Sequence, residues 1–232
     1  MTTNTSFDVD DVAVIGRTFE EYCRFFDLEP ADLVGRTVLD CPSGAASFVA
    51  SAHEHGIDAT GADVTYRHSP SSLTRLCREE YDEMYAQLAT QPDVFNWEEY
   101  GGLEERARCL REAKEVFLAD YPEGRLAGRY AYAALPELPF ASESFSLVLS
   151  AHFLFLYGDR FDAAFHRESL RELVRVARDE VRVYPLVGLD GERYPELEAL
   201  LETLTDDGAR ARVRETPFEF FRGANELLVI EP

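Results

Sequence analysis

Two aspartates and one glycine lie where the first turns of an α/β sheet would place them, and their spacing indicates a ligand site. The stretch VLDCPSGAASFVA, residues 38–50, runs from apolar residues into Asp40, turns at Gly44 and continues as a small-residue helix. Asp63 stands at the end of the next strand-like stretch, where a carboxylate can accept hydrogen bonds from both hydroxyls of a ribose. Asp40 alone would be read as a turn or capping acid. With Gly44 and Asp63 on one β-α-β frame, it favours cofactor binding.

The first turn differs from that of a dinucleotide-binding protein. Such turns carry G-x-G-x-x-G, whose glycines let the backbone approach a pyrophosphate at a helix N-terminus. Here the turn reads DCPSGAAS, in which Gly44 is the only glycine. Asp40 at the strand tip would also repel a pyrophosphate, but it suits a ligand that carries positive charge and lacks phosphates. S-adenosylmethionine, with a sulfonium and an α-ammonium group, is such a ligand.

At these residues the chain resembles the class I S-adenosylmethionine-dependent methyltransferases. The likeness is carried by VLDCPSG (38–44), the acid in GADV (61–64), LPELPFASESFSLVLSAH (135–152) and LRELVRVARDEVRVYPL (170–186). It covers about Leu33 to Leu186 well and the C-terminal hairpin in outline, and it extends poorly to residues 67–128. The resemblance implies an enzyme that uses S-adenosylmethionine to methylate a small-molecule acceptor, which the sequence does not name.

The resemblance also implies which residues surround the cofactor. They come from four segments: Asp40, Cys41, Pro42 and Gly44 beside the methionine part, Asp63 with Val64 at the ribose, Ala134 and Leu135 at the adenine, and Ser150 to His152 below the methyl group. Two departures from the family pattern, at three positions, matter. Pro42 and Ala46 replace common glycines, and Ala134 stands where an acid often meets the adenine amino group. Adenine would then rely on backbone donors and packing.

Three further residues are candidates with an alternative explanation each. His152 ends the most apolar strand, where it is either a general base near neutral pH or a hydrogen-bonding residue that shapes the pocket. Arg17, on the segment before the first strand, could bind the methionine carboxylate, and Tyr22 could place its ring face near the sulfonium. The alternatives for these two are a surface arginine and a packed tyrosine.

Two other functions stay open at this point. A NAD-binding reductase is the enzyme alternative, weakened by the missing glycines and by Asp40. A non-catalytic module that binds S-adenosylmethionine or S-adenosylhomocysteine is the other, and Pro42 and Ala134 keep it open. His53 and His55 do not share a helix face, so we expect no metal site there.

The elements that must position these residues form a single domain. We expect a Rossmann-like three-layer α/β sandwich over residues 1–232, with a mostly parallel seven-stranded sheet, a reversed last strand and a disordered start over residues 1–10. The expected strands span residues 37–41, 57–66, 129–135, 146–157, 180–186, 211–221 and 226–232. The last two are separated only by RGAN, which permits an antiparallel hairpin and forbids a crossover. We expect the Asp63 carboxylate to be exposed at its strand end.

Residues 67–128 contain no strand pattern and exceed what one crossover requires. Apolar residues recur at helical spacing, first at Leu73, Cys77, Tyr81, Met84 and Leu88 and then at Leu103, Ala107, Leu110 and Phe117. We therefore expect an inserted cap of two helices that covers the carboxyl edge of the sheet and closes on substrate. The aromatic residues between the helices, Phe95, Trp97 and Tyr100, are expected to pack the cap rather than to form a substrate cage.

The charge of the chain is strongly acidic. Acidic residues number 44 against 23 basic ones, a net charge of −21, and Lys114 is the only lysine. This composition is typical of a protein adapted to molar salt, and it offers no basic stripe for nucleic acid. The four cysteines show no C-x-x-C pairing, no apolar run is long enough for a membrane span, and no secretory signal is visible. These features predict a cytoplasmic protein with reduced thiols; the oligomeric state is not indicated.

We predict that folding depends on salt. In molar KCl the Debye length shrinks to about 3 Å, so the self-repulsion of an excess of 21 negative charges is screened. Melting curves between low and molar KCl should show a melting temperature that rises with salt. A melting temperature that stays flat or falls would contradict the prediction.

Overall fold

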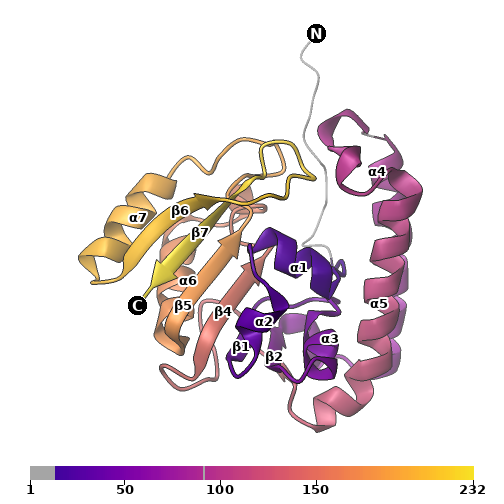
Figure 1. Cartoon of the computed structure of the whole chain (residues 1–232), viewed down its shortest axis with the longest axis horizontal. Coiled ribbons are helices and arrows are strands. Elements are labelled where there is room, and N and C mark those ends of the chain that lie inside the picture. The colour runs from indigo at the N-terminus through magenta and orange to yellow at the C-terminus, as the bar shows by residue number, and fades with distance from the viewer. Residues whose placement is uncertain (1–13, 91) are drawn as a thin grey trace.

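The seven-stranded sheet is the centre of the computed structural model, which describes residues 14–90 and 92–232 (Figure 1). The order of the strands is β3-β2-β1-β4-β5-β7-β6. Only β7 runs against its neighbours, pairing antiparallel with both β5 and β6. The predicted fold, a mostly parallel seven-stranded sheet with a reversed last strand, is confirmed. The expected disordered start lies outside the described residues.

The strands lie within the predicted segments or overlap them. In chain order they are β1 (Thr37–Asp40), β2 (Asp58–Asp63), β3 (Tyr130–Tyr132), β4 (Phe145–Ala151), β5 (Ala177–Tyr184), β6 (Arg210–Glu215) and β7 (Glu226–Glu231). The α-helices are α1 (Phe19–Phe25), α2 (Pro30–Leu33), α3 (Phe48–Glu54), α4 (Pro70–Thr90), α5 (Leu103–Leu126), α6 (Ala163–Val176) and α7 (Leu197–Asp206). Short 3-10 turns are η1 (Val64–Arg67), η2 (Pro92–Val94), η3 (Trp97–Glu99) and η4 (Gly158–Arg160).

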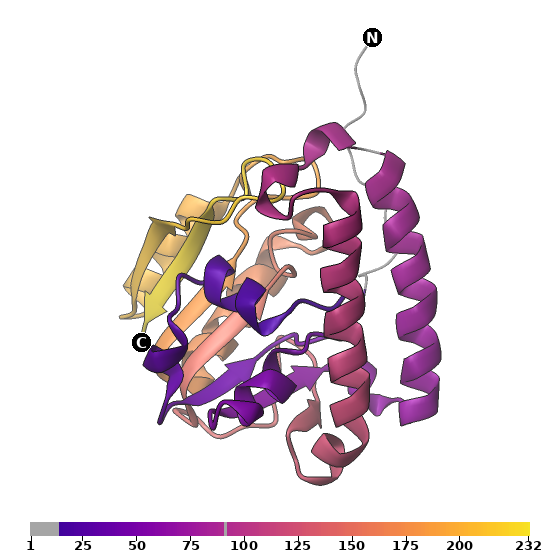
Figure 2. The ribbon, with the colours of Figure 1, turned by 45° about the vertical axis from the view of Figure 1, so that its right-hand side comes forward.

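Helices cover both faces of the sheet, which makes the three layers visible in Figures 1 and 2. One apolar core joins the sheet to α1, α3 and α5, with Phe19, Phe48 and Phe117 among its buried residues. The other core joins it to α6 and α7 through residues such as Leu173 and Leu197. Every residue of β4 is buried, as expected of an apolar strand paired in parallel on both sides.

Two strands, β4 and β6, end six residues earlier than predicted, and both changes affect the cavity described below. The expected strand 146–157 stops at Ala151, because His152 adopts a left-handed backbone with φ +54° that cannot continue the ladder. The expected strand 211–221 stops at Glu215, so the hairpin connection spans residues 216–225 rather than RGAN. Pro217 has no amide to donate, and the Asn96 amide donates to Phe220 O at 2.6 Å, so this loop pairs with the cap instead of with β7.

The segment 67–128 contains the two predicted helices. They run side by side, and α5 packs on α3 and leads into β3, so α5 serves as the crossover while α4 is the addition (Figure 2). The described part of the turn between them, residues 92–102, meets the 216–225 loop. Phe95 and Phe221 form an isolated antiparallel bridge, and the Arg222 amide donates to Val94 O at 3.1 Å. None of the described helices is both long and apolar enough to cross a bilayer.

We predict that Phe117 anchors α5 to the sheet. Its ring is fully buried and lies 6.0, 5.4 and 5.6 Å from the rings of Tyr66, Tyr121 and Tyr130. Phe117→Ala should lower the free energy of unfolding by about 3–5 kcal/mol, measured by denaturant unfolding in high salt. Leu126→Ala on the same helix is the control, since this side chain is 91% exposed and its loss should cost less than about 0.5 kcal/mol. Equal losses in the two variants would contradict the assignment.

Candidate functional site

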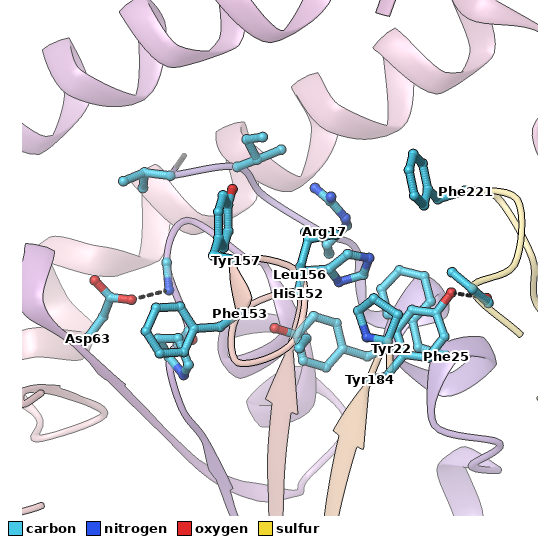
Figure 3. Close-up of a pocket in the computed structure, with 18 of the residues that line it drawn as sticks. Arg17, Tyr22, Phe25, Asp63, His152, Phe153, Leu156, Tyr157, Tyr184 and Phe221 are labelled. Atoms are coloured by element: carbon cyan, nitrogen blue, oxygen red, sulfur yellow. Dashed lines mark hydrogen bonds between the residues drawn. The ribbon is translucent and has the colours of Figure 1, made fainter. Parts of the chain in front are cut away.

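A cavity of about 390 Å³ opens at the carboxyl ends of β1, β2, β4 and β5 (Figure 3). The chain that follows each of these strands lines it: Cys41 to Gly44, Asp63 to Thr65, Ala151 to Phe153, and Tyr184 with Pro185. Because β1 lies between β2 and β4, this edge is the switch point where open α/β sheets bind ligands. The volume falls in the range of small-molecule sites.

Most of the predicted site residues meet at this cavity. Those that line it are Arg17, Tyr22, Cys41, Pro42, Gly44, Asp63, Val64, Ala134, Leu135 and His152. Asp40 and Ser150 do not line it, although each is buried at the end of its strand. The structure therefore gives these two residues no direct contact with the cavity, contrary to what the resemblance implied. For Asp40 the reason is that other side chains cover its carboxylate, as described below.

Asp63 holds the first turn in place. Its Oδ2 accepts the Gly44 amide at 2.8 Å, and its Oδ1 accepts the amide and the hydroxyl of Thr65 at 2.8 and 2.6 Å. The carboxylate is only 6% exposed, so the expectation of an exposed strand-end acid is wrong. Burial raises the pKa of Asp63, while the donors from Thr65 and Gly44 oppose that rise. Because a carboxylate offers about four acceptor positions, a ligand hydroxyl finds one of them unoccupied, beside Gly44.

The amides of the first turn are already bonded within the protein. Besides the Gly44 amide, those of Ser43, Ala46 and Ser47 donate to Ala62 O, Ser43 O and Arg17 O at 3.0, 3.2 and 2.9 Å. A dinucleotide turn needs such amides free to receive a pyrophosphate. This turn has little left to offer phosphate oxygens, which argues against the reductase alternative.

Asp40 lies behind the cavity wall. Ser43 Oγ donates to its Oδ2 at 2.6 Å, and the Tyr22 hydroxyl lies 3.1 and 3.0 Å from its two oxygens. Full burial raises the pKa of Asp40 to about 7, although the bonds from Ser43 and Tyr22 work against this. Since the Tyr22 hydroxyl is turned toward Asp40, Tyr22 presents its ring to the cavity.

Arg17 reaches the cavity as a cation without a carboxylate partner among the described residues. Its backbone is held in place, because its carbonyl accepts the Ser47 amide. The preceding Gly16 packs so closely on the first turn that a Cβ there would lie 2.6 Å from Ala45 O. Its guanidinium donates only to Gly16 O, at 3.1 Å. Burial, and then the charge of Arg106, lower the pKa of Arg17, so an anion placed here would be stabilised.

Arg106 is a cavity residue that the sequence analysis did not identify. It is buried, its Nη1 donates to Glu21 Oε1 at 2.6 Å, and its guanidinium lies over the Tyr100 ring at 4.6 Å. Glu21 also accepts the hydroxyl of Tyr100 and, at 2.7 Å, the amide of Thr18. On an amphipathic helix rich in charged residues, Arg106 has the pattern of a surface residue, so the sequence carries no signal for it.

His152 lines the cavity with an uncharged ring. Its amide donates to Tyr184 O at 2.6 Å, and its ring lies 4.8 Å from Phe25 and 5.3 Å from Tyr184. Burial, followed by the charges of Arg17 and Arg106, holds the pKa of His152 well below its ordinary value. Its Nδ1 is buried and has no hydrogen-bond partner among the described residues.

Aromatic residues from the segment between α4 and α5 and from the 216–225 loop close the far side of the cavity. Phe95 and Phe220 stack at 4.8 Å, Tyr100 meets Phe220 at 4.8 Å, and Phe25 meets Phe218 at 4.7 Å. Phe95 and Tyr100 were expected to pack the cap only, yet both line the cavity. The signal that could have found this wall is PFEFF at residues 217–221, in which the proline argues against a strand.

The pKa of Asp40 predicts a pH dependence of stability. Because the folded state binds this proton more tightly than the unfolded chain does, the free energy of unfolding falls as pH rises from about 4 to about 7. Asp40→Asn lacks this loss. In urea unfolding, the free energy of unfolding of the variant relative to that of the wild type should therefore increase across this pH window, by up to about 4 kcal/mol. If the free energies of unfolding of the two proteins change with pH in parallel, the prediction that the buried Asp40 carboxyl binds a proton in this range is wrong.

Comparisons with known proteins bear on family and fold. No family model matches the chain. Among solved structures, magnesium protoporphyrin IX methyltransferase from Synechocystis PCC 6803 with bound SAM is 14% identical, with a TM-score of 0.48, over 91% of this chain and 76% of that one. The 1,6-didemethyltoxoflavin-N1-methyltransferase from Burkholderia thailandensis, with S-adenosylhomocysteine bound, is 13% identical, with a TM-score of 0.47, over 96% and 79%.

One relative among the curated proteins is similar over almost its whole length. The uncharacterized protein MJ0045 of Methanocaldococcus jannaschii is 32% identical over 224 residues, which cover 96% of this chain and 97% of the relative. Identity of this extent means that the two proteins share one fold and one ancestor. The chain described here therefore belongs to the family of MJ0045.

Proposed function

We propose that the chain is an S-adenosylmethionine-dependent methyltransferase with a small-molecule acceptor. The observation that carries this is that Arg17, a cation without a carboxylate partner among the described residues, lines the same cavity as the strand-end acid Asp63. Figure 3 shows Asp63 on one side and Arg17 farther along. A nucleoside that ends in an amino acid matches this arrangement, because its ribose and its carboxylate are the groups these side chains would bind.

The other predicted residues fit the same ligand. Val64, Ala134 and Leu135 supply apolar surface on the Asp63 side, where an adenine ring would lie. Tyr22 is among the lining residues, and an aromatic ring at this place would suit a sulfonium. The occupied amides of the first turn disfavour a ligand with phosphates. When bound, S-adenosylmethionine would supply a methyl group on a positively charged sulfur.

The contribution of this chain to the reaction is positioning and exclusion of water. Methyl transfer is an in-line displacement, so aligning the acceptor with the methyl carbon lowers the barrier most. Residues 67–128 would act as the cap, since the turn after α4 is bonded to the 216–225 loop above the cavity. A dry, enclosed site also protects the reaction from hydrolysis.

A non-catalytic binding module is the second candidate, because Ala134 leaves the adenine amino group without an acidic partner at that position. Such a module would bind S-adenosylmethionine through the same residues and would never transfer the methyl group. Release of S-adenosylhomocysteine in the presence of a cell extract as acceptor source distinguishes the two. The assay belongs in molar KCl, given the net charge of −21.

The role of Arg17 can be tested with a matched pair of ligands. S-adenosylmethionine has the carboxylate that Arg17 would bind, and 5′-methylthioadenosine lacks it. In calorimetry, Arg17→Met should weaken binding of S-adenosylmethionine by about 10- to 100-fold, as expected for lost charge-assisted hydrogen bonds, and should leave 5′-methylthioadenosine unaffected. Arg178→Met, at an exposed residue paired with Asp179, is the control and should change neither affinity.

The results of these titrations distinguish the methyltransferase proposal from the role assigned to Arg17. If the wild type binds neither nucleoside, or binds NAD more tightly than both, the methyltransferase proposal fails. If it binds both and Arg17→Met weakens them equally, the nucleoside site stands and Arg17 loses its assigned role.

A further inference from the structure

We propose that the methyl acceptor is a flat, largely apolar molecule that binds as an anion, its negatively charged oxygen accepting a hydrogen bond from Nε2–H of His152. The methyl-transfer part of this proposal rests on the proposed function. The binding part concerns the shape and charge of the cavity and can be tested separately.

The shape of the acceptor follows from the rings around His152. The histidine ring lies edge-on to Phe25 and Tyr184, which themselves stack at 5.1 Å. Phe218 and Phe220 continue this surface toward the cap. Walls built from ring faces and edges favour a planar, apolar guest. In Figure 3, His152 lies between Asp63 on one side and Phe221 on the other, next to Arg17.

The proton on His152 is assigned by burial. Nδ1 is enclosed and has no partner among the described residues, whereas Nε2 is not among the enclosed, unbonded atoms and belongs to a ring that lines the cavity. A buried N–H without a partner is rarer in proteins than an unbonded acceptor. The neutral ring therefore keeps its lone pair on Nδ1 and carries its proton on Nε2, where it is a donor toward a ligand. In this state Nε2 cannot take a proton from the acceptor.

The charges around His152 select against a cationic acceptor. Of the described residues that line the cavity, Asp63 is the only acid, and it holds the first turn. Glu21 is already paired with Arg106. Arg17 would be matched by the methionine carboxylate, and Asp63 balances only one of the two positive charges of the cofactor, so among the described residues the other is left without a counter-charge. An anionic acceptor supplies one, and an ammonium group would be repelled.

The absence of a free base among the described lining residues leads to the same class of acceptor. Burial holds the pKa of the Cys41 thiol well above its ordinary value, so this group does not supply a thiolate base. An acceptor that is already ionised needs no base. Its oxygen lone pair forms the bond to the methyl carbon, the bond from that carbon to sulfur breaks, and the electron pair stays on sulfur. The products are a neutral methyl ester or ether and S-adenosylhomocysteine, with no proton to move.

The test compares probes of one shape and different charge. 2-Naphthoate, its neutral amide 2-naphthamide and the cation 2-naphthylmethylammonium are titrated by calorimetry in molar KCl, with and without S-adenosylhomocysteine. With S-adenosylhomocysteine present, 2-naphthoate should bind about tenfold or more tightly than the amide, and the cation should bind most weakly. Equal binding of acid and amide, or tightest binding of the cation, overturns the proposal.

His152→Phe tests the named contact. It keeps an aromatic ring but removes Nε2–H, and it should weaken 2-naphthoate about tenfold while changing 2-naphthamide less. His53→Phe, outside the cavity, is the matched control and should change neither affinity. Equal loss for acid and amide in His152→Phe overturns the role of His152. Should this variant not fold, ¹⁵N NMR of the wild-type ring decides: a proton on Nε2 supports the proposal, and one on Nδ1 overturns it.

4-Nitrophenolate separates the two sources of an anionic oxygen. Tighter binding of 2-naphthoate assigns the acceptor to carboxylic acids, and tighter binding of 4-nitrophenolate assigns it to ionised hydroxyl compounds. If S-adenosylhomocysteine does not bind, the proposed function fails. In that case the affinities of the protein without nucleoside for 2-naphthoate and 2-naphthamide still decide whether the cavity selects anions.

Discussion

The hydrogen bond from the Gly44 amide to the Asp63 carboxylate is the constraint on which the site depends. It joins the turn after β1 to the end of β2, across the position where a dinucleotide-binding protein would hold a pyrophosphate. With Gly44 engaged and Ser47 bonded to Arg17, the turn is closed to phosphates, and the segment before α1 is drawn over it. The same bonds that fix the turn thus define which ligands the cavity accepts, and they bring the guanidinium of Arg17 within reach of it.

Buried ionisable groups lie around the cavity, and the cost of burying Asp40 and Glu21 is reduced in two different ways. Asp40 is covered by Tyr22 and Ser43 and takes up a proton near neutrality, which reduces the cost of burying its charge. Glu21 stays ionised because Arg106 and Tyr100 both donate to it, so the pKa of Glu21 is lowered despite burial. Removing one member of such a pair leaves an uncompensated charge, which is far more costly than the pair itself.

The wall of the cavity is built from segments that are distant in the chain. The turn between α4 and α5 and the 216–225 loop are held together by main-chain hydrogen bonds, and their aromatic residues interleave with Phe25 of α1. These loops therefore form one surface over the sheet edge rather than two independent lids. Among the described residues that line the cavity, Asp63 is the only acid, and Arg17 is a cation without a carboxylate partner.

The sequence by itself determined the seven strands of the sheet, although not where β4 and β6 end. Alternating apolar strands and amphipathic helices have periods that local composition reveals, so the fold class, the reversed last strand and the positions of Gly44, Asp63 and His152 could be predicted. The sequence also indicated two cap helices, because Leu73 to Leu88 and Leu103 to Phe117 keep helical spacing.

Only the tertiary structure decided what each polar group faces. Asp40 and Asp63 look alike in the sequence, yet one lines the cavity and the other is covered, since Tyr22 of α1 donates to Asp40. Arg106 has the pattern of a surface charge on α5, and PFEFF was expected to belong to a strand although its proline argues against one. Both line the cavity because partners far along the chain, Glu21 and Asn96, bond to them. Such contacts depend on how elements pack in space, which local periodicity does not encode.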